Sequence, residues 1–263
     1  MTVVIDIDAP LNNPNIYGFS PPVSTGLLAW HFFGADPSAP TDPAAAATRS
    51  KRNYAFGLPD ATPVNLPTPA TSYLGLGGGA SISAAPSFDT GILDNLAETT
   101  LITVARSAAN FVTNATRPQL VTSWSSLGGT GLYVTGPASG GAAPSATLNI
   151  SEWRTVSGTP TTRSSTLTIA NFSNFGFYAG VSAAGGRRLI AKTAGLDTGF
   201  VADANAKAPV GRNFVIGAGN GGGFYGSNDQ AFAAIYNRAL SVAEIDAIYA
   251  FIKGYLSRRS IEV

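Results

Sequence analysis

The sequence predicts an all-β protein in which two antiparallel sheets pack as a sandwich and a single C-terminal α-helix follows the last strand. Three observations support this fold class. A succession of short β-branched and aromatic runs is separated by Gly, Ser and Asn turns. Residues 231–236 form a short apolar run typical of a buried strand. Directly after it, Ser241 and Glu244 have the spacing of a capping box at the start of an amphipathic helix, at about 242–257.

The predicted elements follow one another along the chain. Residues 1–24 are expected to form an N-terminal arm with a short edge strand at 3–5. Residues 34–70 are rich in proline, and because proline cannot donate to a β-ladder, this segment is predicted to form loops or edge elements. Residues 25–263 contain no repeat or linker and are predicted to be one domain. Its strands are expected at 25–32, 74–76 continuing after a glycine turn at 80–83, 99–106, 119–124, 132–134, 147–153, 165–169, 175–181, 187–192, 213–217 and 231–236.

Composition excludes several partners. Charged residues make up 12% of the 263 residues, and the formal net charge is +1. Nucleic acids and anionic membranes bind concentrated basic patches, and the densest basic run, 49–52, is short, so we expect no nucleic-acid partner. No apolar stretch is long enough to form a transmembrane helix, so we expect no membrane insertion. The absence of cysteine excludes a disulfide framework and a thiolate metal site.

The C-terminal sequence IYNRALS at 235–241, followed by Glu244, resembles the end of concanavalin A-like, laminin-G-like jelly-roll domains. The sequence TGLLAWHF at 25–32 resembles the opening strand of that family, and NFVIG at 213–217 resembles its penultimate strand. The resemblance implies a jelly-roll sandwich with a short helix on its edge. It also implies structural roles for the following residues: Tyr236, Arg238, Ser241 and Glu244.

Catalysis is not expected. Glycanases of this fold carry Glu-x-Asp-x-x-Glu on one strand, which places two carboxylates about 5 Å apart as nucleophile and general acid. The four glutamates of this chain, Glu98, Glu152, Glu244 and Glu262, are far apart in sequence and do not form that motif. We therefore assign no catalytic residue and predict that the protein is not an enzyme.

The chain has one histidine, His31, within an apolar strand. Strand alternation predicts that its side chain faces away from Trp30 and Phe32, toward the surface or a groove. No nucleophile elbow accompanies it, so a structural role is favoured over a triad. One imidazole and no thiol cannot build a transition-metal site.

A glycine-rich segment, 217–228, is predicted to be a wide loop between the last two strands. It matches G-x-G-x-x-G, but no helix starts after it, so a dinucleotide site is rejected. Its aromatic and amide side chains can stack on a sugar ring and pair with sugar hydroxyls. The ligand-binding candidates are therefore Asn220, Phe224, Tyr225 and Asn228, with packing inside the loop as the alternative. The roles of three further aromatics are equally open: Trp124, Trp153 and Tyr178.

No cofactor is expected, with calcium as the alternative. The resemblance raises calcium because relatives of this fold often bind it through carboxylate and amide oxygens. The candidates here are Asp197, Asp203, Asn205 and Asp229, but no spaced Asp-x-Asp-x-Asp loop supports them.

Three functions remain open at this stage. The first is a non-catalytic structural or adhesion protein of a bacteriophage particle, because stand-alone domains with this C-terminal pattern are frequent in phage proteins. It would bind other virion proteins or copies of itself and, in a tail, baseplate or fibre, host glycans; a capsid-decorating position is the alternative. The second function is a free-standing carbohydrate-binding module, and the third is a glycan-active enzyme with a non-standard site.

The first function also predicts a location. The protein would reside in the virion after assembly in the cytoplasm of a bacterial host. No signal peptide is expected, because Asp6 and Asp8 interrupt the N-terminal apolar run.

Overall fold

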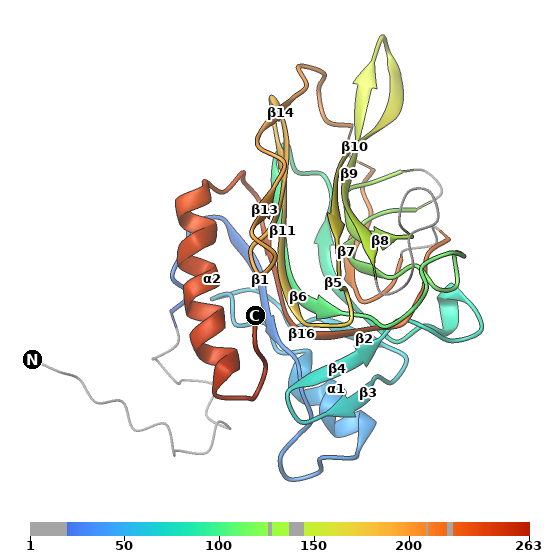
Figure 1. Cartoon of the computed structure of the whole chain (residues 1–263), viewed down its shortest axis with the longest axis vertical. Helices are drawn as coiled ribbons and strands as arrows, with labels where there is room; N and C mark the ends of the chain where they lie inside the picture. The colour runs from blue at the N-terminus through green and yellow to red at the C-terminus, as the bar shows by residue number, and fades with distance from the viewer. Residues whose placement is uncertain (1–19, 126–127, 137–144, 209, 220–222) are drawn as a thin grey trace, which may run out of the picture.

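The computed structural model describes residues 20–125, 128–136, 145–208, 210–219 and 223–263. Within these residues, the strands form two antiparallel sheets, and a helix near the C-terminal end lies against the outer side of one of them (Figure 1). The predicted fold class, an all-β two-sheet sandwich with a C-terminal helix, is confirmed.

The first sheet has nine strands among the described residues. They are β1 (Leu27–Phe32), β3 (Thr68–Ala70), β4 (Tyr73–Leu76), β6 (Thr99–Arg106), β11 (Gly176–Ala183), β12 (Gly186–Ala191), β13 (Leu196–Asp197), β14 (Val201–Ala202) and β16 (Asn228–Tyr236). Their order is β13-β12-β11-β6-β16-β4-β3, with β1 beside β16 and β14 beside β12. The apolar last strand predicted from the sequence, β16, is therefore central.

The second sheet has seven strands within the described part of the chain. They are β2 (Thr62–Val64), β5 (Ser87–Leu93), β7 (Gln119–Thr122), β8 (Gly131–Thr135), β9 (Ala146–Val156), β10 (Thr159–Ile169) and β15 (Asn213–Ile216). Their order is β10-β9-β8-β7-β15-β5-β2. The sandwich strands predicted from residue 25 onward coincide with observed strands, except that the strand predicted at 80–83 is wrong because a 3₁₀ helix lies at Ile82–Ala84. The strand predicted at 3–5 lies outside the described residues.

The proline-rich segment 34–70 is more ordered than predicted. It contains a second helix, α1 (Pro43–Ser50), whose first residue follows Asp42, and the Asp42 carboxylate accepts a hydrogen bond from the backbone N–H of Ala44 at 2.8 Å. Proline at the first helical position is compatible with a helix, so the prediction of loops or edge elements was wrong at 43–50. Pro63 and Pro69 lie in β2 and β3, which are edge strands as expected. A short 3₁₀ helix, η1 (Ile82–Ala84), follows them.

Two apolar cores hold the layers together. The first lies between the sheets and includes Leu101 of β6 and Ile150 of β9. The second lies between the nine-stranded sheet and helix α2 (Val242–Ser257), where the ring centroids of Trp30 and Phe232 are 4.7 Å apart. The buried face of α2 consists of Ile245, Ile248, Ile252 and Leu256. Each such side chain contributes roughly 1.5–3 kcal/mol on burial. Among the described residues, no helix is long and apolar enough to cross a membrane.

The junction between β16 and α2 is held by polar contacts. The Ser241 hydroxyl accepts from the backbone N–H of Glu244 at 3.3 Å, and the Glu244 carboxylate accepts from the backbone N–H of Ser241 at 2.8 Å. Arg238 donates to both oxygens of Glu244, at 2.5 and 3.1 Å. These hydrogen bonds, led by those from Arg238, lower the pKa of Glu244 to about 2. The ring of Tyr236 is buried, and its hydroxyl donates to the carbonyl of Val23.

Candidate functional site

The outer face of the seven-stranded sheet carries hydroxyl, amide and aromatic side chains. On β9, Leu148 and Ile150 belong to the core between the sheets. Strand side chains alternate, so Asn149, Ser151 and Trp153 face outward. This face lies on the side of the molecule opposite to α2 (Figure 1).

A row of hydrogen-bonded side chains crosses β8, β9 and β10 on this face. The Tyr133 hydroxyl lies 2.9 Å from the Ser151 hydroxyl, which in turn lies 2.6 Å from the Ser164 hydroxyl. The indole N–H of Trp153 donates to the Thr162 hydroxyl at 3.2 Å. Tyr133 and Trp153 are half-buried, Thr162 and Ser164 are exposed, and Ser151 between them is fully buried. We call these five residues the hydroxyl face.

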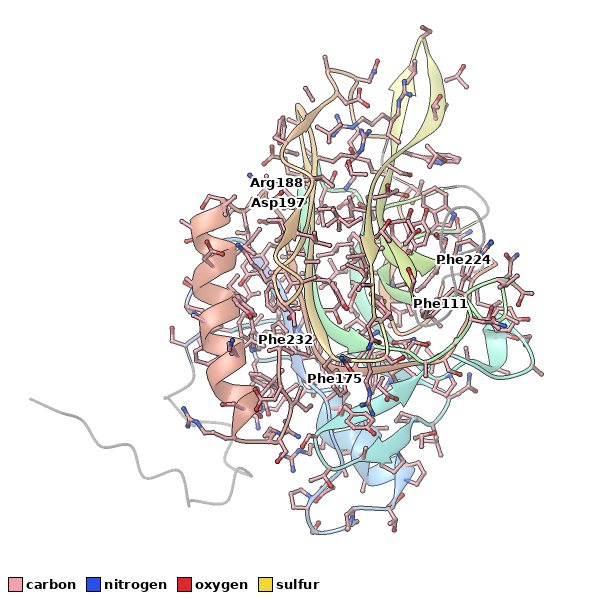
Figure 2. All side chains as sticks on the ribbon, viewed as in Figure 1. Phe111, Phe175, Arg188, Asp197, Phe224 and Phe232 are labelled. Carbon is pink, nitrogen blue, oxygen red and sulfur yellow. The ribbon has the colours of Figure 1, made fainter. Side chains whose placement is uncertain are left out.

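Phe224, one of the predicted ligand-binding residues, lies beside the hydroxyl face. Its ring centroid is 5.6 Å from that of Tyr133, and the Arg117 guanidinium lies 5.3 Å from its centroid. Figure 2 shows Phe224 on the side of the seven-stranded sheet that faces away from α2. The loop 217–228 thus contributes an aromatic ring to the same surface as β8 and β9.

The other predicted loop residues have different surroundings. Tyr225 is half-buried, and its backbone N–H donates to Asn114. Asn228 is 3% exposed, and its side-chain nitrogen donates to the carbonyl of Gly217 at 3.0 Å, which ties the two ends of the loop together. Asn220 lies outside the described residues. Sequence reasoning missed the hydroxyl residues of β8, β9 and β10, although alternating Ser and Thr in β10 is a usable signal.

A buried ion pair anchors the loop between β7 and β8. The Lys207 ammonium lies 2.9 Å from the Asp94 carboxylate, and the two side chains are 3% and 1% exposed. The other oxygen of Asp94 accepts from the Ser123 hydroxyl at 2.5 Å and from the backbone N–H of Thr130 at 3.0 Å. Because Ser123 and Thr130 are the two ends of this loop, Asp94 fixes where the loop lies.

The anchored loop packs against the hydroxyl face through a glycine. Gly128 has a φ of +94°, and a Cβ atom on it would lie 1.9 Å from Cε2 of Trp153. Only glycine fits both the backbone conformation and the close approach of the indole. The loop also carries Trp124, which is half-buried. The orientation of Trp153 therefore depends on the loop that Asp94 holds.

Three of the four glutamates have structural contacts. Glu152 forms an ion pair with Arg154 at 2.6 Å, both side chains are fully buried, and its second oxygen accepts from Ser182. Glu98 accepts from two backbone N–H groups, at 3.0 and 3.3 Å, and Glu244 caps α2. These carboxylates hold the fold together and do not belong to the hydroxyl face.

His31 does not reach the surface or a groove, so that prediction was wrong. Its side chain is 1% exposed, and its ring stacks on Phe33 with centroids 6.2 Å apart. The segment after α1 covers the edge of β1, where the Asn53 side chain pairs with the backbones of Trp30 and Leu28. Burial lowers the pKa of His31 to about 4, so the imidazole is neutral near neutral pH.

The three candidate calcium aspartates are all paired with arginine. Asp197 lies 2.6 Å from Arg188, and the hydrogen bonds that the Arg188 guanidinium donates lower the pKa of Asp197. Figure 2 shows this pair beside α2. Further pairs join Asp203 to Arg187, with Asn205 hydrogen-bonded to Asp203, and Asp229 to Arg106. Within the described ranges, no group of three His, Cys, Asp or Glu residues is placed to hold a metal ion.

Comparison with known proteins shows a likeness of fold. No protein-family model and no curated protein sequence matches this chain. The botulinum neurotoxin serotype G binding domain is similar with a TM-score of 0.56 and 7% identity, over 86% of this chain and 51% of that chain. The serotype D binding domain is similar with a TM-score of 0.54 and 8% identity, over 86% and 50%.

A third similar structure is the binding domain of botulinum neurotoxin DC in complex with SialylT. It has a TM-score of 0.54 and 7% identity, over 86% of this chain and 51% of that chain. This chain therefore spans about half the length of these structures. At such low identity the likeness establishes the fold alone.

Proposed function

We propose that this protein is a non-catalytic carbohydrate-binding module and that the hydroxyl face, together with Phe224, is its binding surface. The observation that carries the proposal is the row of hydroxyl groups flanked by the half-buried rings of Tyr133 and Trp153. Aromatic rings pack against the C–H face of a sugar. The exposed hydroxyls of Thr162 and Ser164 can donate to and accept from sugar hydroxyls, and the buried Ser151 holds Ser164 and Tyr133 in place.

The charge of the surface supports binding without catalysis. The five residues of the hydroxyl face are uncharged, and Arg117 lies beside Phe224 at their margin. Hydrolysis by a retaining glycosidase requires two carboxyl groups about 5 Å apart. The buried Glu152 already has Arg154 as its partner. We infer that the face holds a glycan and does not cleave it.

Two similar structures support the same ligand class. One contains SialylT and another, of serotype D, contains N-acetylneuraminic acid. Those sugars are ligands of those proteins. For this chain they support carbohydrate as the class to test first.

The experiment is a glycan array probed with the wild-type chain and two variants of the face. We expect Trp153→Ala to weaken binding by about 1 kcal/mol or more, because it removes an aromatic surface. Tyr133→Phe keeps the ring and removes the hydroxyl that contacts Ser151. The matched control is Phe56→Ala, which removes an aromatic side chain that is 99% exposed in another loop. A wild-type chain that binds no immobilised glycan would refute the proposal.

We also propose that binding requires no metal or other cofactor, since the candidate aspartates are paired with arginines. Binding measured after treatment with EDTA should equal binding in added calcium. Binding that disappears with EDTA and returns with calcium would restore the calcium alternative.

We keep the bacteriophage particle as the proposed setting, on the strength of the C-terminal sequence pattern. A tail, baseplate or fibre position would let the module contact host glycans, with a capsid-decorating position as the alternative. Its partners would then be other virion proteins or copies of itself, after assembly in the host cytoplasm. Immunogold labelling of particles purified from the source culture tests this setting, and unlabelled particles would contradict it.

A further inference from the structure

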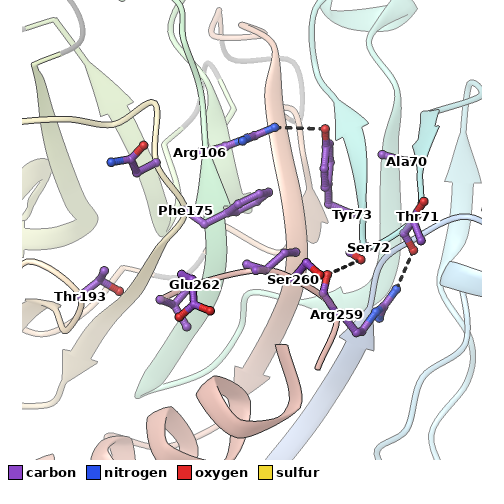
Figure 3. Close-up of a pocket in the computed structure, with 13 residues that line it drawn as sticks. Ala70, Thr71, Ser72, Tyr73, Arg106, Phe175, Thr193, Arg259, Ser260 and Glu262 are labelled. Carbon is purple, nitrogen blue, oxygen red and sulfur yellow. Dashed lines mark hydrogen bonds between the residues drawn. The ribbon is translucent and has the colours of Figure 1, made fainter. Parts of the chain in front are cut away.

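The outer face of the nine-stranded sheet is hollowed where α2 ends. On β6, Ile102 and Val104 pack under α2, and Arg106 follows two residues later on the same face. Figure 3 shows Arg106 next to both Tyr73 and Phe175, with the segment that follows α2 along one side. The hollow has a volume of about 740 Å³, and we call it the rim groove.

Two further hollows share wall residues with the rim groove. A second hollow of about 310 Å³ also has Tyr73 in its wall and extends to Asp229. A third hollow of about 320 Å³ also has Phe175 in its wall and extends to Tyr178. Because they share wall residues, the three hollows adjoin one another, which leaves room for more than one sugar unit.

The centre of the rim groove is a platform of planar groups. The rings of Tyr73 and Phe175 have centroids 5.3 Å apart. The guanidinium of Arg106 lies 4.5 Å from the Phe175 centroid and 5.0 Å from that of Tyr73. Phe175 is 8% exposed beneath the guanidinium, so the half-buried ring of Tyr73 and the plane of Arg106 are the surfaces that can pack against the C–H groups of a sugar ring.

Hydrogen-bonding capacity remains beside the platform. Arg106 donates through Nε to Asp229 at 2.9 Å and through Nη2 to the Tyr73 hydroxyl at 3.1 Å, so the described residues use two of its five N–H groups. The side chains of Arg106 and Asp229 are 34% and 31% exposed. The exposed side chains of Asn174 and Glu262 also border the groove. Donors and acceptors therefore lie side by side, as a sugar with neighbouring hydroxyl groups requires.

The charge balance selects the kind of sugar. Asp229 pairs with Arg106 at 2.9 Å, and the wall of the groove contains the carboxylate of Glu262 as well as the guanidinium of Arg259. A sulfate, phosphate or carboxylate ligand would meet these carboxylates as well as the guanidinium groups, and like-charge contacts oppose binding. An uncharged sugar meets no such repulsion.

We propose that the rim groove is a second binding site, which takes uncharged sugar units of a linear oligosaccharide. The inference rests on the proposed function for its ligand class, but it uses different residues on the opposite outer face of the sandwich. One chain would then bind two glycans at once. It would cross-link a polysaccharide or a multivalent glycoconjugate without forming an oligomer.

The test compares the wild type with face and groove variants on an array of linear neutral oligosaccharides and oligouronic acids. The proteins are the wild type, the face variant Trp153→Ala and the groove variant Tyr73→Ala. Asp229→Asn is a second groove variant that keeps the shape of the side chain. Arg258→Ala, an exposed arginine at the end of α2, is the matched control. Thermal unfolding confirms that each variant is folded.

We expect the face variant to keep binding to neutral oligosaccharides. When a groove substitution is added to the face variant, the affinity of the double variant for these oligosaccharides should fall at least tenfold below that of the face variant. Each single variant should lose the ability to precipitate a multivalent neutral glycoconjugate while it still binds the monovalent sugar. If the face variant alone abolishes all binding, the rim groove is not a site and the proposed function stands. If the groove variants lose affinity for oligouronic acids but keep their affinity for neutral oligosaccharides, the assignment to neutral sugars is wrong. If the wild type binds nothing, both proposals fail.

Discussion

Glu152 and Arg154, two residues apart on β9, form an ion pair at 2.6 Å in which both side chains are fully buried. Arg154 also donates to five backbone carbonyls, at 2.5 to 3.1 Å. These carbonyls belong to the β11–β12 turn and to the segment 203–205. One arginine thus joins three separate parts of the chain.

Arg154→Met is expected to be strongly destabilising. The variant leaves the Glu152 carboxylate buried without its partner, and breaking a buried pair in this way costs about 3–5 kcal/mol. Urea unfolding at neutral pH measures the loss. The double variant Glu152→Leu/Arg154→Met should recover part of the stability, because it removes the uncompensated charge. A single variant with wild-type stability would contradict the importance of the pair.

Lys207→Met should release the β7–β8 loop as well as lower stability. Asp94 would lose the buried ammonium group that pairs with it, and its hydrogen bonds from Ser123 and Thr130 would be disturbed. We expect a loss of several kcal/mol and faster proteolytic cleavage within 123–130. Lys253→Met, at an exposed position of α2, is the control for losing a lysine. Equal cleavage rates in the two variants would show that the pair does not anchor the loop.

Gly128→Ala should weaken glycan binding by displacing Trp153. The new methyl group would overlap the indole, and alanine is strained at a φ of +94°. We expect a loss of about 1–3 kcal/mol in stability and a change in tryptophan fluorescence. Gly185→Ala, whose added Cβ would meet open space, is the matched control. Unchanged fluorescence would mean that the indole does not depend on the glycine.

Ser241→Ala and Glu244→Gln are each expected to cost about 1 kcal/mol, the usual cost of losing a helix cap. The pKa of Glu244 is lowered to about 2, mainly by hydrogen bonds from Arg238. Its contribution is therefore present above the ordinary glutamate pKa of 4.5 and is lost as the pH falls toward 2. Because Arg238 and Glu244 are 27% and 31% exposed, solvent screening keeps the effect small. Glu262→Gln should not change this pH dependence.

The stability of the folded protein should also depend on pH through His31, in a different pH range from that of Glu244. Burial lowers its pKa to about 4, from 6.5 in the unfolded chain. Between these values the unfolded chain binds a proton that the folded protein does not, so stability falls as the pH falls from 6.5 to 4. The effect is at most about 3 kcal/mol. Urea unfolding of wild type and His31→Phe across this range measures it. A variant with the same pH dependence as the wild type would exclude His31 as the cause.

Much of the fold was predictable because strands and caps have local signals. The β-branched run of β6 predicts a strand, and the Ser241–Glu244 spacing predicts a helix cap, each from a few neighbouring residues. Helix α1 was missed because its Asp42–Pro43 start competes with the prolines around it. His31 was misplaced because alternation gives the relative direction of neighbouring side chains, whereas the segment after α1 decides which side is covered.

The candidate site was predicted in part. Phe224 was identified because an aromatic residue in a glycine-rich loop is visible in the sequence. Tyr133, Ser151 and Ser164 were not, because their contacts depend on the register that pairs β8 with β9 and β9 with β10. That register is a property of three strands together.

The sequence by itself determined the sandwich, its last strand and the capped helix, since each depends on interactions between near neighbours. The tertiary structure alone decided where the charges are neutralised and which polar groups share a face. Asp94 and Lys207, 113 residues apart, become partners only when the loops around the seven-stranded sheet close. A buried charge must find a partner in space, and the chain's path through both sheets determines which residue that is.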